Sequence, residues 1–443
     1  MAKTNTTRRN PNPQVTHEGA SALPLGSNER QLRRAVANCL LWEDGFYEQG
    51  VAIADRITGL VAKCKPEYVM ALAQEARSVM NLRHAPLWLL VGLMRKDSPA
   101  APGLADAIAA TVSRADEPGE LLAMFRKANP GVKAFPAALK RGLAKAMQKW
   151  DPYQLGKYKR GDKTEFTLRD ILRITHAKPK DAEQGELWKQ VIAGTLKAPD
   201  TWEVALSGGA DKRATFERLL AEQKLGYMAV LRNLRNMVDS GVSTPLVRET
   251  ILARKGARRV LPFRYVAAAR AAPQFENELD EALVASINEV PQFLGETIIL
   301  VDVSGSMGAK LSGKSDLTRM DAAATLASIF PGKARVFTFN TAVQEVPPRK
   351  GMAGVDAIRR RMGGGTLLGA AVTAVNRLPH DRLIVITDEE SHDVVPAPAA
   401  KLGYMINVAQ AKHEVGLGKW NRIAGFSENV LRWMAELERE QGE

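Results

Sequence analysis

Apolar residues recur at helical spacing from about residue 28 to residue 289. After Lys65-Pro66-Glu67, where proline suits the first turn of a helix, apolar residues return every three or four positions. Similar stripes occupy residues 32–41, 51–61, 87–94, 104–112, 137–147 and 216–238. Alternation with period two is almost absent. The pattern therefore predicts pairs of short helices, stacked as a solenoid or closed into a ring, although no strict sequence repeat is visible.

The pattern changes near Pro291. Short β-branched runs then alternate with helical segments, which predicts a doubly wound parallel sheet. The expected strands are 297–301, 334–339, 383–387 and 422–426, and the expected helices are 322–329, 355–361, 368–376 and 430–438. Together the two patterns predict three parts: a disordered polar arm (residues 1–27), a helical-repeat domain (28–290) and an α/β domain (291–443).

Charge separates the two predicted domains. The formal net charge is +13, yet residues 291–443 hold 18 Lys/Arg against 17 Asp/Glu, and residues 1–290 hold the other 44 Lys/Arg against 32 Asp/Glu. A basic helical part favours a polyanionic partner. No apolar run is long enough for a membrane span, and residues 1–27 lack the apolar core of a signal peptide, so we expect a cytoplasmic protein. The two cysteines, Cys39 and Cys64, have no metal-ligand spacing and are expected to be buried, reduced thiols.

Hydroxyl and carboxylate side chains follow the predicted strands of the α/β domain. Asp302, Ser304 and Ser306 form a DxSxS motif directly after the first strand, Thr366 follows three glycines, and Asp388 ends the strand at 383–387. Because parallel strands end at one edge of a sheet, these five residues are expected to meet there. Mg²⁺ prefers such oxygen ligands, which predicts a magnesium site. The alternative is a Ser/Gly turn with helix-capping residues.

The basic charge of the helical part is concentrated in residues 126–178, which hold 14 Lys/Arg against Asp151, Asp162, Glu165 and Asp170. Trp150, Tyr153, Tyr158 and Phe166 are interleaved with the basic residues. Basic groups can follow phosphates and aromatic rings can stack on unpaired bases, so this segment favours RNA binding. The alternative is a solvated helix face with core aromatics. The candidate RNA-binding residues are Lys157, Lys159, Arg160, Lys163, Arg173 and His176, with a second cluster of Arg254, Lys255, Arg258 and Arg259.

Two resemblances add to these interpretations. The DxSxS–Thr–Asp series resembles the metal-ion-dependent adhesion site of the von Willebrand factor A family, which implies that an acidic group of a partner completes the coordination of Mg²⁺. Residues 157–160, 168–179 and 228–237, with a weaker match at 261–264, resemble the TROVE module of the Ro ribonucleoproteins, of the bacterial or phage type. An A-type domain follows the module in that family too.

The Ro resemblance implies a ring of HEAT-like helical repeats, here expected to be monomeric, that an A-type domain closes. It further implies that small Y-like RNAs bind on the outer surface and that single-stranded ends of misfolded or damaged RNA enter the hole, in RNA quality control beside an exoribonuclease. Lys157 and His176 fall where the family's Y-RNA contact surface lies, although His176 could instead cap the C-terminus of a helix.

Two rival functions remain open at this point. In the first, the A-type domain is a metal-dependent module that recruits an acidic protein partner, and RNA binding is secondary. In the second, the chain is a ribonuclease or hydrolase. Ser306 lacks the GxSxG surroundings of a nucleophile elbow, since Ser304 stands where glycine is needed, and His380 and His392 lack further triad signals. We therefore expect a binding protein and not an enzyme.

Overall fold

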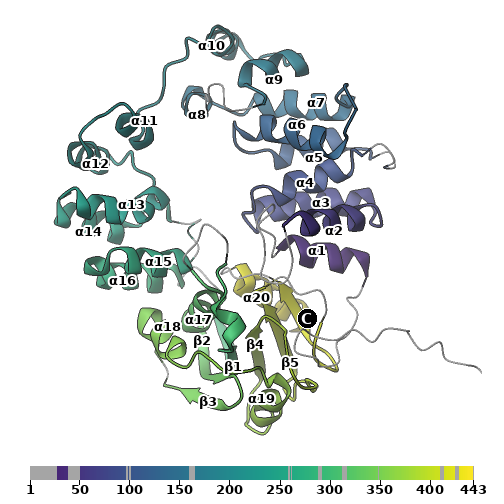
Figure 1. The fold of residues 1–443 in the computed structure, drawn as a ribbon, viewed down its shortest axis with the longest axis vertical. Coiled ribbons are helices and arrows are strands. Elements are labelled where there is room, and N and C mark those ends of the chain that lie inside the picture. The colour runs from purple at the N-terminus through teal and green to yellow at the C-terminus, as the bar shows by residue number, and fades with distance from the viewer. Residues whose placement is uncertain are drawn as a thin grey trace, which may run out of the picture. The chain divides into compact units, whose positions relative to one another are not determined.

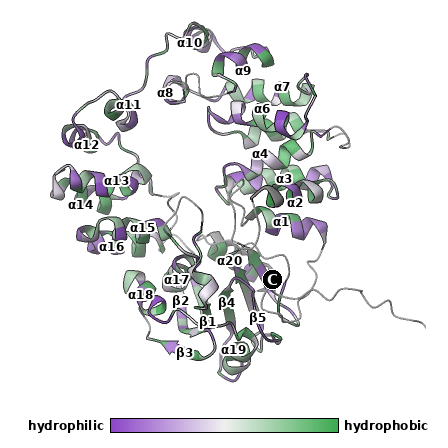
Figure 2. Ribbon diagram, viewed as in Figure 1, coloured by the Kyte–Doolittle hydropathy of each residue, from purple (hydrophilic) through white to green (hydrophobic). Residues whose placement is uncertain are grey.

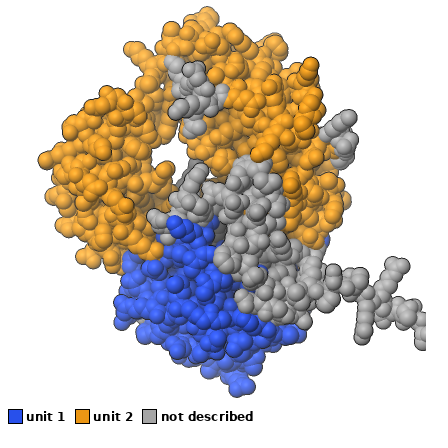
Figure 3. Space-filling model, viewed as in Figure 1, with its two compact units in different colours: residues 1–27, 45–47, 283–443 blue, residues 28–44, 48–282 orange. Residues whose placement is uncertain are grey.

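A computed structural model separates the chain into two compact units, one within residues 28–282 and one within residues 283–443 (Figure 3). We call them the helical unit and the α/β unit, and the chain passes from one to the other within helix α16. The structure describes residues 27–37, 50–95, 98, 101–158, 165–257, 260, 262–287, 292–311, 317–347, 349–409, 414–424 and 429–442.

The helical unit is built from short α-helices (Figure 1). They are α1 (Asn28–Ala37), α2 (Gly50–Val61), α3 (Pro66–Ser78), α4 (Ala85–Gly92), α5 (Leu104–Thr111), α6 (Glu117–Ala128), α7 (Ala137–Met147), α8 (Pro152–Lys157), α9 (Leu168–Thr175), α10 (Ala182–Ala193), α11 (Trp202–Ser207), α12 (Lys212–Ala221), α13 (Tyr227–Asp239), α14 (Thr244–Ala253), α15 (Phe263–Ala271) and α16 (Glu276–Ile287), with a 3-10 turn η2 (Pro273–Phe275).

These helices stack in two layers. Helices α1, α3, α5, α7 and α9 contact one another in sequence, and α2, α4 and α6 form the second layer. The pairing continues in α12 with α14 and α13 with α15. Most helices carry hydrophobic and hydrophilic residues together (Figure 2), as expected where one face is buried against the other layer. Helix α4, the central helix of its layer, has all eight of its residues buried.

The apolar stripe at residues 216–238 predicts one continuous segment, and the structure corrects this prediction. Helix α12 ends at Ala221, Gln223 adopts a left-handed conformation with φ +54°, and α13 begins after Gly226. Both helices bury apolar faces, so the spacing of hydrophobic residues continued across the turn. Gly226 was the sequence signal for the break.

The α/β unit contains a six-stranded sheet in the order β3-β2-β1-β4-β5-β6. Its elements are β1 (Phe293–Asp302), η3 (Gly305–Gly308), α17 (Arg319–Ser328), β2 (Gly332–Phe339), β3 (Val343–Val346), α18 (Gly351–Arg359), α19 (Leu368–Val375), β4 (Arg382–Thr387), β5 (Leu402–Asn407), β6 (Asn421–Ala424) and α20 (Asn429–Gly442). Ile298 and Leu300 pack with α19, and α17 contacts the same strand, so helices cover the sheet as in a doubly wound fold.

Two strands differ from the sequence prediction. Strand β3 pairs antiparallel with β2, so the sheet is mixed and not purely parallel. The turn after Asn340 is too short for a parallel crossover, which needs a dozen or more residues. Strand β5 was not predicted, and it pairs in parallel with β4 and β6. The last expected strand, 422–426, corresponds to β6, and its residues 425 and 426 lie outside the described residues.

Cys64 is buried and forms no disulfide, and burial raises the pKa of its thiol. Cys39 and residues 1–26 lie outside the part that the structure describes. Within the described ranges, no helix combines the length and the apolar character that crossing a membrane requires.

Candidate nucleic-acid interface and metal centre

Helix α9 presents a basic face. A capping box between Thr167 and Asp170 fixes the start of the helix, and His176 ends it in a left-handed conformation with φ +49°. Arg169, Arg173 and His176 follow one another at spacings of four and three residues, so they share one face, and all three are exposed. His176 is thus both the helix cap and part of an exposed basic face.

Within the described ranges neither Arg169 nor Arg173 forms an ion pair, although both attract the neighbouring carboxylate of Asp170, whose pKa is lowered first by its hydrogen bonds in the capping box and then by these two charges. Basic residues on other helices do form ion pairs: the ammonium group of Lys189 on α10 lies 2.6 Å from Glu186, and that of Lys145 on α7 lies 2.5 Å from Asp106. Unpaired guanidinium groups on a solvent-exposed face are available for phosphate oxygens.

Lys157 lies at the end of α8, the helix that precedes α9. It is exposed, and its ammonium group lies 6.0 Å from the centre of the Tyr153 ring, which is 48% exposed. The other predicted residues of this stretch, Lys159, Arg160 and Lys163, lie outside the described residues. The structure therefore describes Lys157, Arg173 and His176 of the first predicted cluster, and Arg169 is an exposed cation that the prediction omitted.

The interleaved aromatic residues divide into two groups. Trp150 and Phe166 are buried, and the Phe166 ring lies 5.7 Å from Phe135 and under the guanidinium of Arg126. These two rings belong to the core, so the expectation that they stack on bases is wrong. Tyr153 and Tyr158 remain partly exposed.

The second predicted basic cluster is less accessible than its sequence suggested. Arg254 is half-buried and ends α14 in a left-handed conformation, and the Lys255 ammonium donates to Gln223. Arg258 and Arg259 lie outside the described residues. This segment therefore supplies fewer available cations than α9 does.

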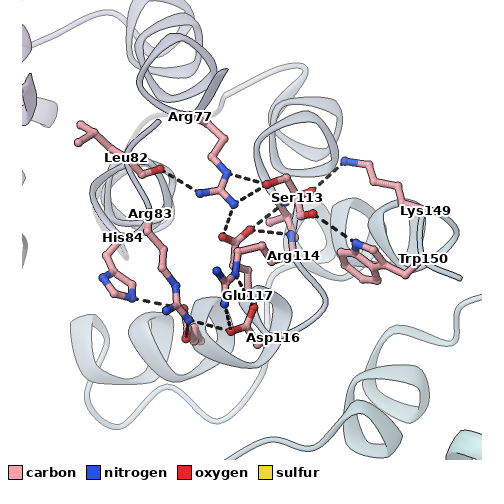
Figure 4. A network of polar contacts seen from close by, with 12 residues as sticks. Arg77, Leu82, Arg83, His84, Ser113, Arg114, Asp116, Glu117, Lys149 and Trp150 are labelled. Carbon is pink, nitrogen blue, oxygen red and sulfur yellow. Dashed lines mark hydrogen bonds and ion pairs between the residues drawn. The ribbon is translucent and has the colours of Figure 1, made fainter. Parts of the chain in front are cut away.

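A buried polar network joins α3, α6 and the two residues Lys149 and Trp150 that follow α7 (Figure 4). The carboxylate of Glu117, fully buried, accepts from Arg77 and from the backbone N–H groups of Ser113 and Arg114 at 2.8 and 3.0 Å. Its pKa is raised because burial outweighs these contacts. The network fixes the loop between α5 and α6.

The predicted metal ligands of the α/β unit come together at one edge of the sheet. Strands β1 and β4 are parallel neighbours, so Asp302 and Asp388 follow adjacent strand ends. The Thr387 hydroxyl donates to Asp302 at 2.7 Å, and the Ser304 and Ser306 hydroxyl oxygens lie 3.2 Å apart. This edge lies where the strand order reverses, the place at which doubly wound sheets bind ligands.

The loop of Thr366 is tied to the DxSxS loop through its backbone. The N–H of Gly363 donates to Val303 at 2.8 Å, and the N–H of Gly305 donates to Gly364 at 3.1 Å. Gly363 and Gly364 have φ of +132° and +84°, a conformation that glycine adopts without strain. His392 bonds the backbone of Thr366 through Nδ1, so this histidine holds the loop and has no triad.

The donor set fits a hard divalent cation. Within the ranges described, no group of three or more His, Cys, Asp or Glu side chains is placed to hold a metal, and the site instead combines two acids with hydroxyls, all oxygen donors. Asp302 and Asp388 are fully buried. Burial and the charge of Asp388 raise the pKa of Asp302 to about 7, so a cation placed here would relieve an unfavourable pair of like charges.

Sequence reasoning missed Arg319. Its guanidinium lies 3.3 Å from the Asp388 carboxylate, and both side chains are buried. Every residue of α17 is buried, Arg319 and Asp321 included. A helix that is apolar on nearly all sides is buried, and any charged residue on it needs a partner. The Ala-rich pattern was therefore the sequence signal that Arg319 is paired.

Comparisons with known proteins place these features. A family model described as the TROVE domain matches residues 182–297, which begins at α10, after Lys157, Arg173 and His176. Telomerase protein component 1 from Mus musculus and its counterpart from Rattus norvegicus are each 34% identical over 100 residues. These alignments cover 21% of this chain, and the chain spans only 4% of the length of each relative.

A solved structure extends the match over nearly the whole chain. The crystal structure of the Deinococcus radiodurans Ro (RSR) protein aligns with 93% of this chain and 100% of its own, with a TM-score of 0.60 and 20% sequence identity. The predicted fold, helical repeats followed by a von Willebrand factor A-like α/β unit, is confirmed. The chain is thus similar to the TROVE domain over residues 182–297 and shares its overall fold with a Ro protein.

Proposed function

We propose that this protein binds RNA, with the exposed face of α9 and the end of α8 as its contact surface. The observation that carries the proposal is the set of exposed basic side chains at Arg169, Arg173, His176 and Lys157, of which the two arginines form no ion pair in the described part of the chain. Phosphate contacts from such side chains supply affinity without reading sequence.

The finer proposal is that of a Ro-type protein in RNA quality control. A small, structured Y-like RNA binds on the outer surface, and single-stranded ends of misfolded or damaged RNA enter a monomeric ring that the helices close with the α/β unit. An exoribonuclease is the proposed partner, and the setting is the cytoplasm. The fold shared with a Ro protein supports this choice over other basic helical proteins.

An RNA-affinity measurement tests the proposal. Lys157→Ala with His176→Ala should weaken binding of a hairpin RNA with a single-stranded tail, because phosphate contacts are lost. Lys189→Ala is the matched control, since Lys189 is equally basic but ion-paired on α10. Equal affinities for the double variant and the control would contradict the assignment of this face. Incubation of labelled RNA with Mg²⁺ and the protein should yield no cleavage.

The α/β unit carries a second proposed function. Asp302, Ser304, Ser306, Thr366 and Asp388 would hold Mg²⁺, and the metal would supply an open coordination position for a carboxylate of a partner protein. The tied loops and the two buried acids support this proposal. Asp302→Ala should abolish capture of that partner and leave RNA affinity unaltered. Loss of both activities in a folded variant would contradict two separate sites.

A further inference from the structure

A cavity of about 600 Å³ lies beside the basic face of α9. Its walls come from α6 and the residues just before it, the end of α8, α9 and the segment 191–196. The residues that decide its chemistry are Asp116, Glu120, Leu155, Tyr158, Arg169 and Arg173. A volume of this size falls in the range of small-ligand sites.

Two guanidinium groups line one side of this cavity. Arg169 and Arg173 are one helical turn apart on α9, both are exposed, and neither is ion-paired in the described part of the chain. The side chain of Arg169 reaches over Gly194, within 3.8 Å of where a Cβ would stand. These cations belong to the cavity and to the proposed RNA face together, so a phosphate bound there would lie at the cavity's edge.

A planar group supplies another wall. Tyr158 is half-buried, and the guanidinium of Arg114 lies 4.9 Å from the centre of its ring. Burial raises the pKa of the Tyr158 phenol, which therefore stays neutral at ordinary pH. Leu155 is fully buried beside the cavity. Aromatic rings and guanidinium planes are the surfaces on which unpaired bases stack.

Acidic residues also line the cavity. Asp116 accepts from Arg114 at 3.0 and 2.9 Å and from Arg83 at 2.8 Å (Figure 4). Burial opposes ionisation of Asp116, but the hydrogen bonds from Arg114 prevail and lower its pKa. Glu120 also pairs with Arg83. Asp116, Glu120 and the lining residue Glu165 already have cationic partners. Asp170, which also lines the cavity, attracts Arg169 and Arg173 and offsets part of their charge. An ionised carboxylate accepts hydrogen bonds only.

We propose that this cavity binds one unpaired nucleotide of an RNA held on α9, with its phosphate at Arg169 and Arg173 and its base against Tyr158. The proposal rests on the proposed RNA-binding function. A purine presents a larger face to the Tyr158 ring than a pyrimidine does, so the cavity favours guanine over uracil.

The experiment follows a fluorescent base. A hairpin RNA carries 2-aminopurine at one unpaired position, and its emission is measured as full-length protein is added. Stacking on Tyr158 quenches the emission. Tyr158→Ala removes the quenching and weakens binding by about tenfold, the loss expected for one base–aromatic contact. Tyr158→Phe keeps the ring and is the matched control, so it retains both the quenching and the affinity.

A change on the RNA side guards against misfolding of the alanine variant. With unaltered protein, replacing the unpaired guanosine by an abasic site should lower affinity by about tenfold, and uridine should fall between the two. Binding without quenching in the parent, or equal affinity for the guanosine and abasic RNAs, would overturn the nucleotide site and leave RNA binding on α9 intact. Failure of every RNA to bind would instead overturn the proposed function.

Discussion

Replacing Glu117 by alanine should lower the free energy of unfolding of the helical unit by about 4 kcal/mol. The Glu117 side chain is fully buried, and the guanidinium of Arg77 that it pairs with is 13% exposed. Removing one partner of a buried ion pair leaves the other charge uncompensated, which costs about 3–5 kcal/mol. The same change removes the acceptor of the Ser113 and Arg114 N–H groups, each of which can cost about 1–3 kcal/mol if it stays buried.

Burial also raises the pKa of Glu117, so part of its pairing energy is already offset by the desolvation of the carboxylate. We therefore place the expected loss at the middle of the ion-pair range and not at the sum of all contacts. After the substitution, water can also reach the Ser113 and Arg114 N–H groups, and this hydration further reduces the expected loss of stability.

Urea denaturation followed by circular dichroism at a helix band measures this loss, because most helices belong to the helical unit. Glu186→Ala on α10 is the matched control. It removes an acid whose ion pair with Lys189 is mostly exposed, and such pairs contribute little. A Glu117→Ala midpoint no lower than that of the control would refute the reasoning that this network anchors α3, α6 and the residues that follow α7.

Three further predictions concern the two sites. Arg169→Ala with Arg173→Ala should reduce the slope of log affinity against log salt by about 2, one for each lost phosphate contact, in a filter-binding series; an unchanged slope would remove α9 from the interface. In metal-free protein the pKa of Asp302 is raised to about 7, so the folded state keeps a proton that the unfolded state loses above about pH 4. The free energy of unfolding should therefore fall as the pH rises from about 4 to about 7. Asp302→Asn should flatten that fall in melting curves recorded in EDTA, and a parallel fall would contradict it. Gly369→Ala should destabilise the α/β unit by about 1–3 kcal/mol, because the new Cβ would stand 2.2 Å from the Val394 carbonyl oxygen. A denaturation midpoint equal to that of the parent protein would contradict this prediction.

The clustering of the candidate metal ligands could be predicted from the sequence because their positions obey local rules. Asp302 and Asp388 each follow a short buried strand, and parallel neighbours end at one edge whatever lies between them. The partner of Asp388 could not be predicted in this way. Arg319 reaches it across 69 residues, and only the burial of α17 on all sides implies that its charges have partners.

The helical unit shows a different limit. Hydrophobic spacing predicts helices, but it cannot locate a turn where the apolar positions keep the same spacing on both sides, as between α12 and α13. Aromatic residues within a basic segment could not be sorted by sequence either. Phe166 is buried against Phe135 and Tyr158 is only half-buried, although both lie in the same basic segment. The difference depends on which helices pack around them.

The most direct test of RNA binding is an equilibrium titration of the purified full-length chain with a hairpin RNA that has a single-stranded 3′ tail, at several salt concentrations. Saturable binding at low salt, with affinity falling by a factor of about ten or more between 50 and 200 mM salt, is expected if two or more phosphates are contacted. If no folded or frayed RNA binds at the lowest salt, the basic face of α9 has another purpose and the central claim fails.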